Sequence, residues 1–88
     1  MYYVYLIQSQ KSKMFYIGST GDLDKRLVEH NNKQTKSTSL YTPWKLVYYE
    51  AFLSEKDARK REKALKHHGK GIAELKKRLD NSIIKINN

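Results

Sequence analysis

Cysteine is absent from this chain of 88 residues, which excludes disulfide bonds and thiolate metal sites. Proline occurs once and glycine four times, so few positions are marked as breaks in regular structure. No apolar run approaches the roughly 18–20 residues that a membrane span needs, and the N-terminus shows no basic leader. We therefore expect a cytoplasmic protein without a membrane span, held together by packing alone.

Acidic residues are also scarce, because nine Asp and Glu stand against eighteen Lys and Arg and leave a formal charge of +9. A protein with this balance attracts polyanions and raises their concentration at its surface. Nucleic acid is therefore the expected partner. A basic surface that serves only solubility stays open at this point, since charge indicates partners and not chemistry.

The length sets the domain organisation. A chain of 88 residues has room for one compact domain with one modest core, because so short a chain buries only about 60–65% of its unfolded surface. We expect a single domain over residues 1–80 and a frayed C-terminal tail over residues 81–88. The sequence gives no indication of an oligomeric state.

Two short segments near the N-terminus combine β-branched and aromatic side chains, the composition of strands. They cover residues 2–7 and 14–18, and the polar residues between them predict a hairpin turn. Antiparallel pairing would place Tyr5 opposite or nearly opposite Tyr16, with both side chains on one face of the sheet. The register is open by one or two residues.

A helix is predicted after the second strand. Thr20 and Asp22 are both suited to accept hydrogen bonds from the free amides of a first helical turn, and the helix should end near residues 31–32. Arg26 and His30 stand four residues apart, so their side chains leave this helix on the same side.

Residues 32–43 are polar and contain the one proline, which predicts a mobile connection of the kind that often carries function. Residues 44–52 return to strand composition and are apolar on both faces, with Trp44, Leu46 and Tyr48 expected on the same one. Because a strand that is apolar on both faces is usually buried on both, we expect it at the centre of the sheet.

Two more helices complete the chain. Ser54 begins a sequence that resembles a capping box and opens a helix reaching about residues 67–68. A last helix is expected over residues 72–79, where apolar residues recur at helical spacing. The order strand, strand, helix, strand, helix, helix predicts an α+β fold, a small three-stranded antiparallel sheet flanked by helices.

Glu62 is out of place in this pattern. At about 100° per residue it falls only about 40° from Ala58, near the apolar face of its helix. A carboxylate without partners there costs several kcal/mol, so a cation should accompany it: an arginine, a lysine or a divalent metal. Periodicity alone equally allows Glu62 to lie just outside the core, paired on the surface with Lys66 or Arg59.

These residues, taken in order, resemble the GIY-YIG nuclease domain. Tyr3-Val4-Tyr5 stands at the place of the first family motif, with tyrosine instead of its glycine, and Tyr16-Ile17-Gly18 matches the second motif. Arg26, His30 and the segment of residues 58–62 follow at familiar distances. The resemblance covers nearly the whole chain, is closest to the small standalone bacterial members, and implies the fold of that family.

The resemblance implies a metal-dependent endonuclease that hydrolyses DNA phosphodiester bonds with one Mg²⁺ or Mn²⁺ held by Glu62. It assigns Tyr16 the role of general base toward the attacking water, and Tyr5 that of orienting it. A tyrosine with a pKa near 10 needs nearby positive charge for this task, which Arg26 and the metal would supply. Arg26 would also clamp the phosphate. His30 would relay a proton or bind phosphate, although a lone histidine on a helix is more often structural, and that role stays open as well.

The resemblance and the charge together imply contacts to the DNA backbone with little sequence specificity, in DNA repair or recombination. Gly18 would permit close approach of DNA or simply a tight strand exit. The basic residues within 56–78 form a run that would follow the phosphates. The expected nucleic-acid-binding residues are Gly18, Arg26, Lys33, Lys36, Arg59 and Lys66.

Two other classes of function stay open. A catalytically weak or inactive module could bind DNA or RNA through the same basic surface and strand aromatics. The intact set of Tyr5, Tyr16, Arg26 and Glu62 argues against it, because a binding protein has no need of an inward carboxylate. A structural or assembly protein could present its basic face to an acidic protein partner. The preferred DNA structure cannot be read from the sequence.

Overall fold

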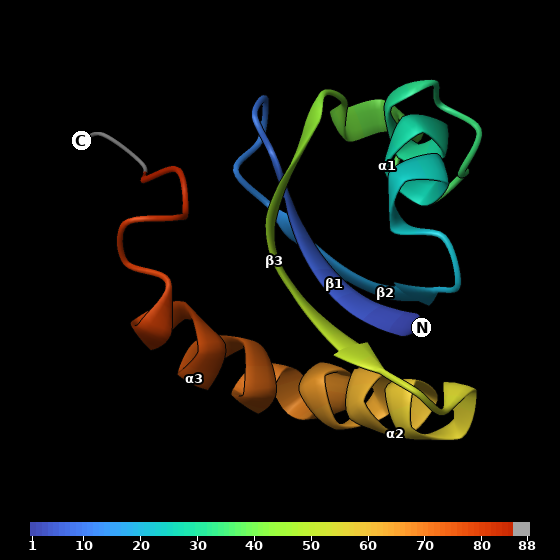
Figure 1. The fold of residues 1–88 in the computed structure, drawn as a ribbon. Coiled ribbons are helices and arrows are strands. Elements are labelled where there is room, and N and C mark those ends of the chain that lie inside the picture. The colour runs from blue at the N-terminus through green and yellow to red at the C-terminus, as the bar shows by residue number, and fades with distance from the viewer. Residues whose placement is uncertain (86–88) are drawn as a thin grey trace.

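The computed structural model describes the backbone of residues 1–85 and every side chain among them except that of His68. Strands β1 (Tyr2–Ser9), β2 (Phe15–Thr20) and β3 (Trp44–Phe52) form one antiparallel sheet in the order β2-β1-β3. Helix α1 (Leu23–Asn31) lies on one side of the sheet, and α2 (Glu55–Lys66) and α3 (Lys70–Arg78) extend along the other (Figure 1). The expected α+β fold and the order of its elements are confirmed.

The helices begin where their capping residues predict. Asp22 caps α1 by accepting a hydrogen bond from the backbone amide of Lys25 at 3.1 Å. Ser54 caps α2 by accepting from the amide of Asp57 at 3.4 Å. Short 3-10 helices at Ser39–Tyr41 and His67–Gly69 lie in the connections, and the second of them joins α2 to α3. No helix among residues 1–85 is long and apolar enough to span a membrane.

The central strand is β1, so the expectation that residues 44–52 form it is wrong. Residues 4–9 of β1 are buried without interruption, whereas every position of β3 after its first residue is half-buried or exposed. The apolar composition of β3 has another cause. Its apolar and aromatic side chains are partly buried against the two cores, although the strand itself lies at the edge of the sheet.

A bulge in β3 explains a second difference from the expected pattern. Leu6 pairs with Tyr48 but Ile7 pairs with Leu46, which leaves Val47 as the extra residue. A bulge of this kind changes the face to which the following side chains point. Leu46 therefore packs with Ile7, and Tyr48 packs with Leu6 in the other core, so Leu46 and Tyr48 do not share a face.

The larger core lies between the sheet and the pair α2 and α3, and burial of each of its large aliphatic side chains contributes about 1.5–3 kcal/mol. Its fully buried members are Val4, Leu6, Ile17, Ala58, Leu65, Leu75 and Leu79. Arg61 fixes α2 against β3 by a two-pronged ion pair with Glu50, at 2.9 Å between its Nη2 and Oε2. The next residue, Glu62, points instead toward β2, where it accepts a hydrogen bond from Ser19.

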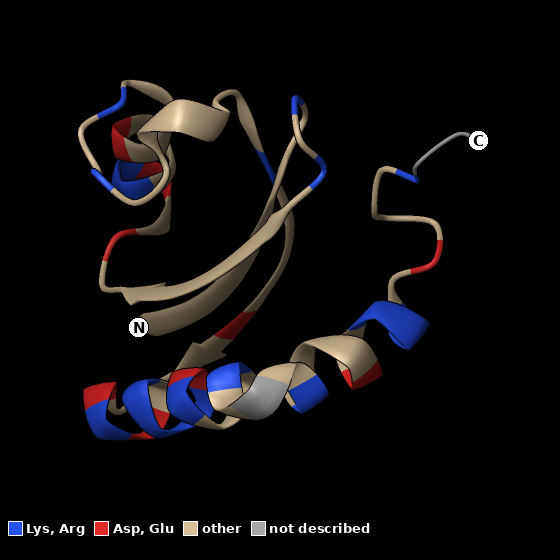
Figure 2. Ribbon diagram, turned by 180° about the vertical axis from the view of Figure 1, so that it is seen from behind, with Lys and Arg blue, Asp and Glu red and all other residues tan. Residues whose placement is uncertain are grey.

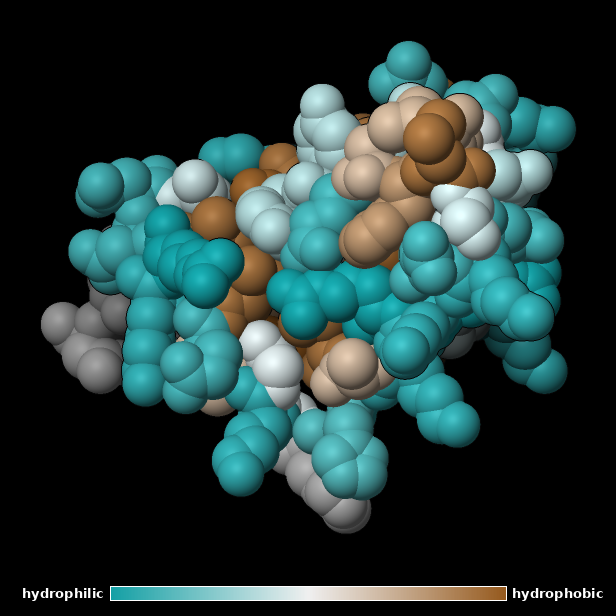
Figure 3. All heavy atoms as spheres, turned by 60° about the horizontal axis from the view of Figure 1, so that its bottom comes forward, coloured by the Kyte–Doolittle hydropathy of each residue, from teal (hydrophilic) through white to brown (hydrophobic). Residues whose placement is uncertain are grey.

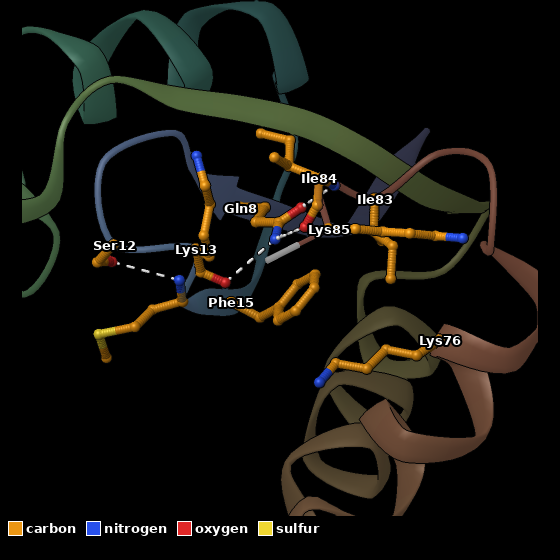
Figure 4. Close-up of a pocket in the computed structure, with 9 residues that line it drawn as sticks. Gln8, Ser12, Lys13, Phe15, Lys76, Ile83, Ile84 and Lys85 are labelled. Carbon is orange, nitrogen blue, oxygen red and sulfur yellow. Dashed lines mark hydrogen bonds between the residues drawn. The ribbon is translucent and has the colours of Figure 1, made fainter. Parts of the chain in front are cut away.

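The last described residues return to the sheet. The buried amide of Gln8 donates to the Ile84 carbonyl at 2.8 Å and accepts from the Ile84 amide at 2.7 Å, beside a groove of about 480 Å³ (Figure 4). Ile83 packs against the larger core. The tail that we expected to fray is thus held at Ile83 and Ile84, while residues 86–88 lie outside the described residues.

Candidate active site

The ring of Tyr5 lies across Gly18 of the neighbouring strand. The two residues pair in register, and a Cβ atom added to Gly18 would overlap the Tyr5 ring and hydroxyl. Tyr16 pairs with Ile7 and therefore shares the face of Tyr5 at a diagonal position two residues away. Gly18 is buried in the middle of β2, so it makes room for Tyr5 and does not offer the open backbone that close approach of DNA would require.

His30 lies fully buried behind the two tyrosines. Its Nε2 atom is 2.8 Å from the Tyr5 hydroxyl, and its Nδ1 atom is 2.8 Å from the Thr38 hydroxyl. The Thr38 hydroxyl donates to the carbonyl of Thr35 at 3.3 Å, so it accepts from Nδ1–H, and Nε2 of the neutral ring accepts from Tyr5. The Tyr5 proton therefore points at His30.

The surroundings keep both members of this pair neutral. Burial, followed by the charge of Arg26, lowers the pKa of His30, and the charge of Glu29 partly opposes them. Burial raises the pKa of the Tyr5 hydroxyl, although hydrogen bonding and charge from Arg26 act in the other direction. Near neutral pH the site thus holds a neutral imidazole and a protonated phenol.

Glu62 lies on α2 beside the edge strand β2. Its Oε1 accepts a hydrogen bond from the Ser19 hydroxyl at 2.7 Å, and its Oε2 accepts one from the Lys66 ammonium at 2.8 Å. Burial acts to raise the pKa of this carboxyl, but hydrogen bonds from Lys66 and Ser19 and the charges of Lys66 and Arg59 outweigh it and the pKa is lowered. Glu62 is therefore an ionised carboxylate tied to β2, with 22% of its side chain exposed.

Lys66 links Glu62 to Tyr16. Its Nζ atom bonds the carboxylate and also lies 5.6 Å from the centroid of the Tyr16 ring. Tyr16 is contacted edge-on by His30 at 5.3 Å and by Trp44 at 6.3 Å between ring centroids. Tyr16 and Glu62 thus both neighbour the Lys66 ammonium at the edge of the sheet, although the strand directs Tyr16 to the face opposite α2.

Arg26 borders the site on the α1 side. Hydrogen bonding to Tyr5 raises the pKa of the Arg26 guanidinium, which also forms an ion pair with Glu29 at 3.2 Å. A shallow hollow of about 420 Å³ opens beside it, lined by residues 19–22, Lys25, Arg26 and Glu29. Ser19 lines this hollow and also donates a hydrogen bond to Glu62, so it links the hollow to the carboxylate.

We name this arrangement the β2-edge site: Tyr5, Tyr16, Ser19, Arg26, His30, Glu62 and Lys66. The structure brings all five expected catalytic residues into it, and their roles stay predictions. Ser19 and Thr38 were not among the expected residues. Ser19 follows the second family motif directly, which was the available signal, whereas no pattern in the sequence marks Thr38 as the partner of a buried histidine.

The connection between α1 and β3 is anchored more firmly than its composition predicts. Thr38 is fully buried, and its carbonyl accepts a hydrogen bond from the Trp44 indole at 2.9 Å. The Ser9 hydroxyl donates to the carbonyl of Tyr41 at 2.5 Å. Lys33 and Lys36 are exposed in this connection, where they can meet a polyanion without being part of the β2-edge site.

The other basic side chains gather on the outer helices. Ten of the eighteen Lys and Arg fall within residues 56–78, and Figure 2 shows them along α2 and α3. Arg59 among them is exposed and forms an ion pair with Glu55 at 3.5 Å. Seen from the side of these helices, the surface is largely hydrophilic (Figure 3), as expected of a face that meets a charged backbone.

The donor atoms at Glu62 fit a hard divalent cation. Mg²⁺ prefers oxygen ligands, keeps several waters, and is commonly held by only one or two carboxylates. The carboxylate of Glu62 and the adjacent Ser19 hydroxyl are such oxygens. Among the residues that the structure describes, no group of three or more His, Cys, Asp or Glu is placed to hold a metal, so any ion at this site must rely mainly on water.

Comparison with known proteins decides the family. The GIY-YIG catalytic domain family matches residues 1–80. The chain belongs to the GIY-YIG family. Among the proteins to which this GIY-YIG chain is similar, a UPF0213 protein of Staphylococcus saprophyticus is 36% identical over 66 residues, covering 74% of this chain and 79% of the relative. A UPF0213 protein of Clostridium perfringens is 40% identical over 67 residues, covering 75% and 71%.

A third relative, a UPF0213 protein of Streptococcus pneumoniae, is 37% identical over 65 residues, covering 73% of this GIY-YIG chain and 65% of the relative. No solved structure matches the chain significantly. Membership confirms the resemblance to small standalone bacterial GIY-YIG proteins and places the chain in a family of nuclease type. GIY-YIG nucleases generally use divalent metal ions.

Proposed function

We propose that this protein is a metal-dependent endonuclease that hydrolyses DNA phosphodiester bonds at the β2-edge site. The observation that carries the proposal is that an anchored carboxylate, Glu62, and the phenol ring of Tyr16 both neighbour one ammonium group, that of Lys66, at the edge of β2. Family membership supports the same reaction. The formal charge of +9 supports a polyanionic substrate.

Glu62 and the neighbouring Ser19 hydroxyl would hold one Mg²⁺ or Mn²⁺ ion. Such an ion polarises the phosphate and stabilises the leaving oxygen, which contributes several kcal/mol to the transition state. The hydrogen bond from Ser19 keeps the carboxylate at the β2 edge. The lowered pKa of Glu62 keeps it ionised at neutral pH, the state in which a carboxylate binds metal.

Tyr16 is the proposed general base and takes a proton from the attacking water through its phenolic oxygen. The Lys66 ammonium, 5.6 Å from its ring centroid, supplies positive charge on one side. Tyr5 cannot take this role, because burial raises its pKa and its proton is donated to His30. A protonated Tyr5 instead keeps its oxygen available as an acceptor that orients the groups around Tyr16.

Arg26 binds the phosphate in the hollow between β2 and α1. Its side chain is 34% exposed, so the guanidinium reaches the hollow while its other contacts hold it in place. A planar guanidinium bonds two oxygens of a phosphate at once. Preorganised positive charge of this kind stabilises the charge that develops on the phosphate.

His30 acts through Tyr5. A fully buried ring has no access to a phosphate, and hydroxyl groups engage both of its ring nitrogens, so among the roles that the sequence left open the structural one fits its place best. The chain from Tyr5 through His30 to Thr38 holds the Tyr5 ring across Gly18. We therefore assign His30 as a positioning residue.

Incubation of the purified protein with supercoiled plasmid and with single-stranded DNA, in Mg²⁺, Mn²⁺ or EDTA, tests the proposal. The wild type should cleave only with metal. Glu62→Gln and Tyr16→Phe should lose at least about 100-fold in rate, as expected for a metal ligand and a general base. Glu55→Gln, which also removes one carboxylate from α2, should retain the wild-type rate and serves as the control.

Two outcomes would reject the proposal. Equal cleavage by the wild type and Glu62→Gln would mean that the active site lies elsewhere or that another nuclease is present. DNA or RNA binding by the wild type without cleavage in any metal would favour the nucleic-acid-binding module instead.

A further inference from the structure

We propose that Lys66 is the resident counter-ion of Glu62 and that a divalent metal ion reaches Glu62 by displacing the Lys66 ammonium. The inference rests on the proposed metal-dependent nuclease and adds a step to it. It makes Lys66 a positioning residue of the β2-edge site, beyond the backbone contact expected from its charge.

Both carboxylate oxygens of Glu62 are engaged in hydrogen bonds. Oε1 accepts from the Ser19 hydroxyl at 2.7 Å and Oε2 accepts from the Lys66 ammonium at 2.8 Å. The two donors differ in what they can do when a cation arrives. A hydroxyl can turn its lone pairs toward the cation, whereas an ammonium group has three donors and no acceptor. Lys66 is therefore the partner that must leave.

The Lys66 ammonium and a metal ion would compete for the same oxygen of Glu62. A metal ion on Oε2 would lie within a few ångströms of the present position of the Lys66 Nζ atom, which is 2.8 Å from that oxygen. Charges of the same sign at such a separation repel each other strongly even near a protein surface. The ammonium and the ion cannot both stay on Oε2, so the binding of one opposes the binding of the other.

The Lys66 side chain has room to move away from Glu62. Its side chain is 48% exposed, and lysine carries its charge on a flexible four-carbon stem that water solvates readily. The face of the Tyr16 ring, 5.6 Å from Nζ, offers the released ammonium a favourable neighbour. The exchange is therefore reversible, and it weakens metal binding by the modest amount that a partly exposed ion pair contributes.

Between binding events Lys66 has a second effect. The ion pair holds the carboxylate at the β2 edge in the absence of metal. Without it, the charge of Glu62 would be left half-buried with only the Ser19 hydroxyl as a partner. Lys66 thus keeps the site prepared and sets the concentration of metal at which it fills.

The test is the affinity for Mn²⁺, measured by calorimetry on the wild type, Lys66→Met, Lys66→Arg, Lys63→Met and Glu62→Gln. Lys66→Met should bind Mn²⁺ about two- to tenfold more tightly, since the competing ion pair is removed. Lys63→Met removes the same charge from the same helix at a position with no ion pair to Glu62 and should stay within about twofold of the wild type. Lys66→Arg keeps the competing charge and should bind like the wild type.

The outcomes separate this inference from the proposal beneath it. Glu62→Gln should abolish binding, and unchanged binding by that variant would overturn both the metal site and the exchange. If Glu62→Gln abolishes binding but Lys66→Met binds equally or more weakly than the wild type, the exchange is wrong and the nuclease proposal stands. Thermal unfolding of Lys66→Met, expected within a few degrees of the wild type, shows that each comparison is made on folded protein.

Discussion

The Tyr5 hydroxyl donates a hydrogen bond to Nε2 of His30 over 2.8 Å, and both side chains are buried between the sheet and α1. Tyr5→Phe removes the donor and leaves a buried ring nitrogen without a partner, which costs about 1–3 kcal/mol. We expect the free energy of unfolding, measured with urea, to fall by that amount. The rate of DNA cleavage should fall as well, because His30, which contacts the Tyr16 ring edge-on, would lose the hydrogen bond that holds it in place.

Tyr49→Phe is the matched control for Tyr5→Phe. Tyr49 pairs with Tyr5 across β1 and β3 but is 51% exposed. Loss of its hydroxyl should therefore change the free energy of unfolding by less than about 0.5 kcal/mol. If the two substitutions lower the free energy of unfolding equally, the hydrogen bond between Tyr5 and His30 does not stabilise the fold.

The burial of His30 predicts how stability depends on pH. Its pKa is lowered in the folded protein by burial and by the charge of Arg26, against Glu29, while Tyr5 and Thr38 face its two nitrogens. Below the unfolded-state pKa of about 6.5 the unfolded chain takes up a proton that the folded protein refuses. The free energy of unfolding should therefore decrease as the pH falls from about 7 toward 5.

Measurement of urea unfolding across this range checks the sign. The carboxyls with lowered pKa values, Glu50 and Glu62, add their own loss of stability only at lower pH, below the ordinary pKa of about 4.5. The two effects are thus separated in pH. A stability that stays flat or rises between pH 7 and 5 would contradict the neutral, buried state of His30.

Gly18 gives a prediction about sterics. A Cβ atom there would overlap the Tyr5 ring, whereas a Cβ on Gly21 would meet only the Tyr2 ring at 3.7 Å, an ordinary contact. Gly18→Ala should cost about 1–3 kcal/mol, as overpacking does, and should reduce cleavage by displacing Tyr5. Gly21→Ala should be nearly neutral. If Gly18→Ala has the same free energy of unfolding as the wild type, the close packing of the Tyr5 ring on Gly18 does not contribute to stability.

The β2-edge site shows which features a sequence can predict. Strand composition, the capping residues Asp22 and Ser54 and the position of Glu62 on α2 are local properties, and the structure agrees with them. These features need no knowledge of which elements become neighbours. The common face of Tyr5 and Tyr16 depends in addition on the register of β1 and β2, because a shift of one residue would place the two rings on opposite faces.

The features that could not be predicted depend on such neighbours. The bulge at Val47 decides the faces of Leu46 and Tyr48, and no local pattern marks it. Thr38 becomes the partner of His30 only after the connection folds over α1. The alternatives for Glu62 were also not exclusive: it forms the surface pair with Lys66, and at the same time it is half-buried and accepts a hydrogen bond from Ser19 of β2.

DNA binding through the basic face should depend steeply on salt. Each phosphate neutralised by a lysine or arginine releases counterions, so the logarithm of the affinity falls more steeply with the logarithm of the salt concentration. For duplex DNA each such contact makes the slope more negative by about 0.9. Lys60→Gln and Lys63→Gln on the exposed side of α2 should each make this slope shallower by up to that amount. Fluorescence anisotropy with a labelled duplex measures it, and an affinity that does not change with salt would exclude backbone contacts as the source of binding.

The central claim is that Glu62 holds a divalent ion at the edge of β2 beside Tyr16. Paramagnetic broadening of backbone amide signals by substoichiometric Mn²⁺ tests it directly, since the signals nearest the ion broaden first. We predict that residues 16–19 and 61–63 broaden first in the wild type and that Glu62→Gln abolishes the effect. Broadening centred instead on the acidic residues Asp22 and Asp24, or unchanged in Glu62→Gln, would contradict the account.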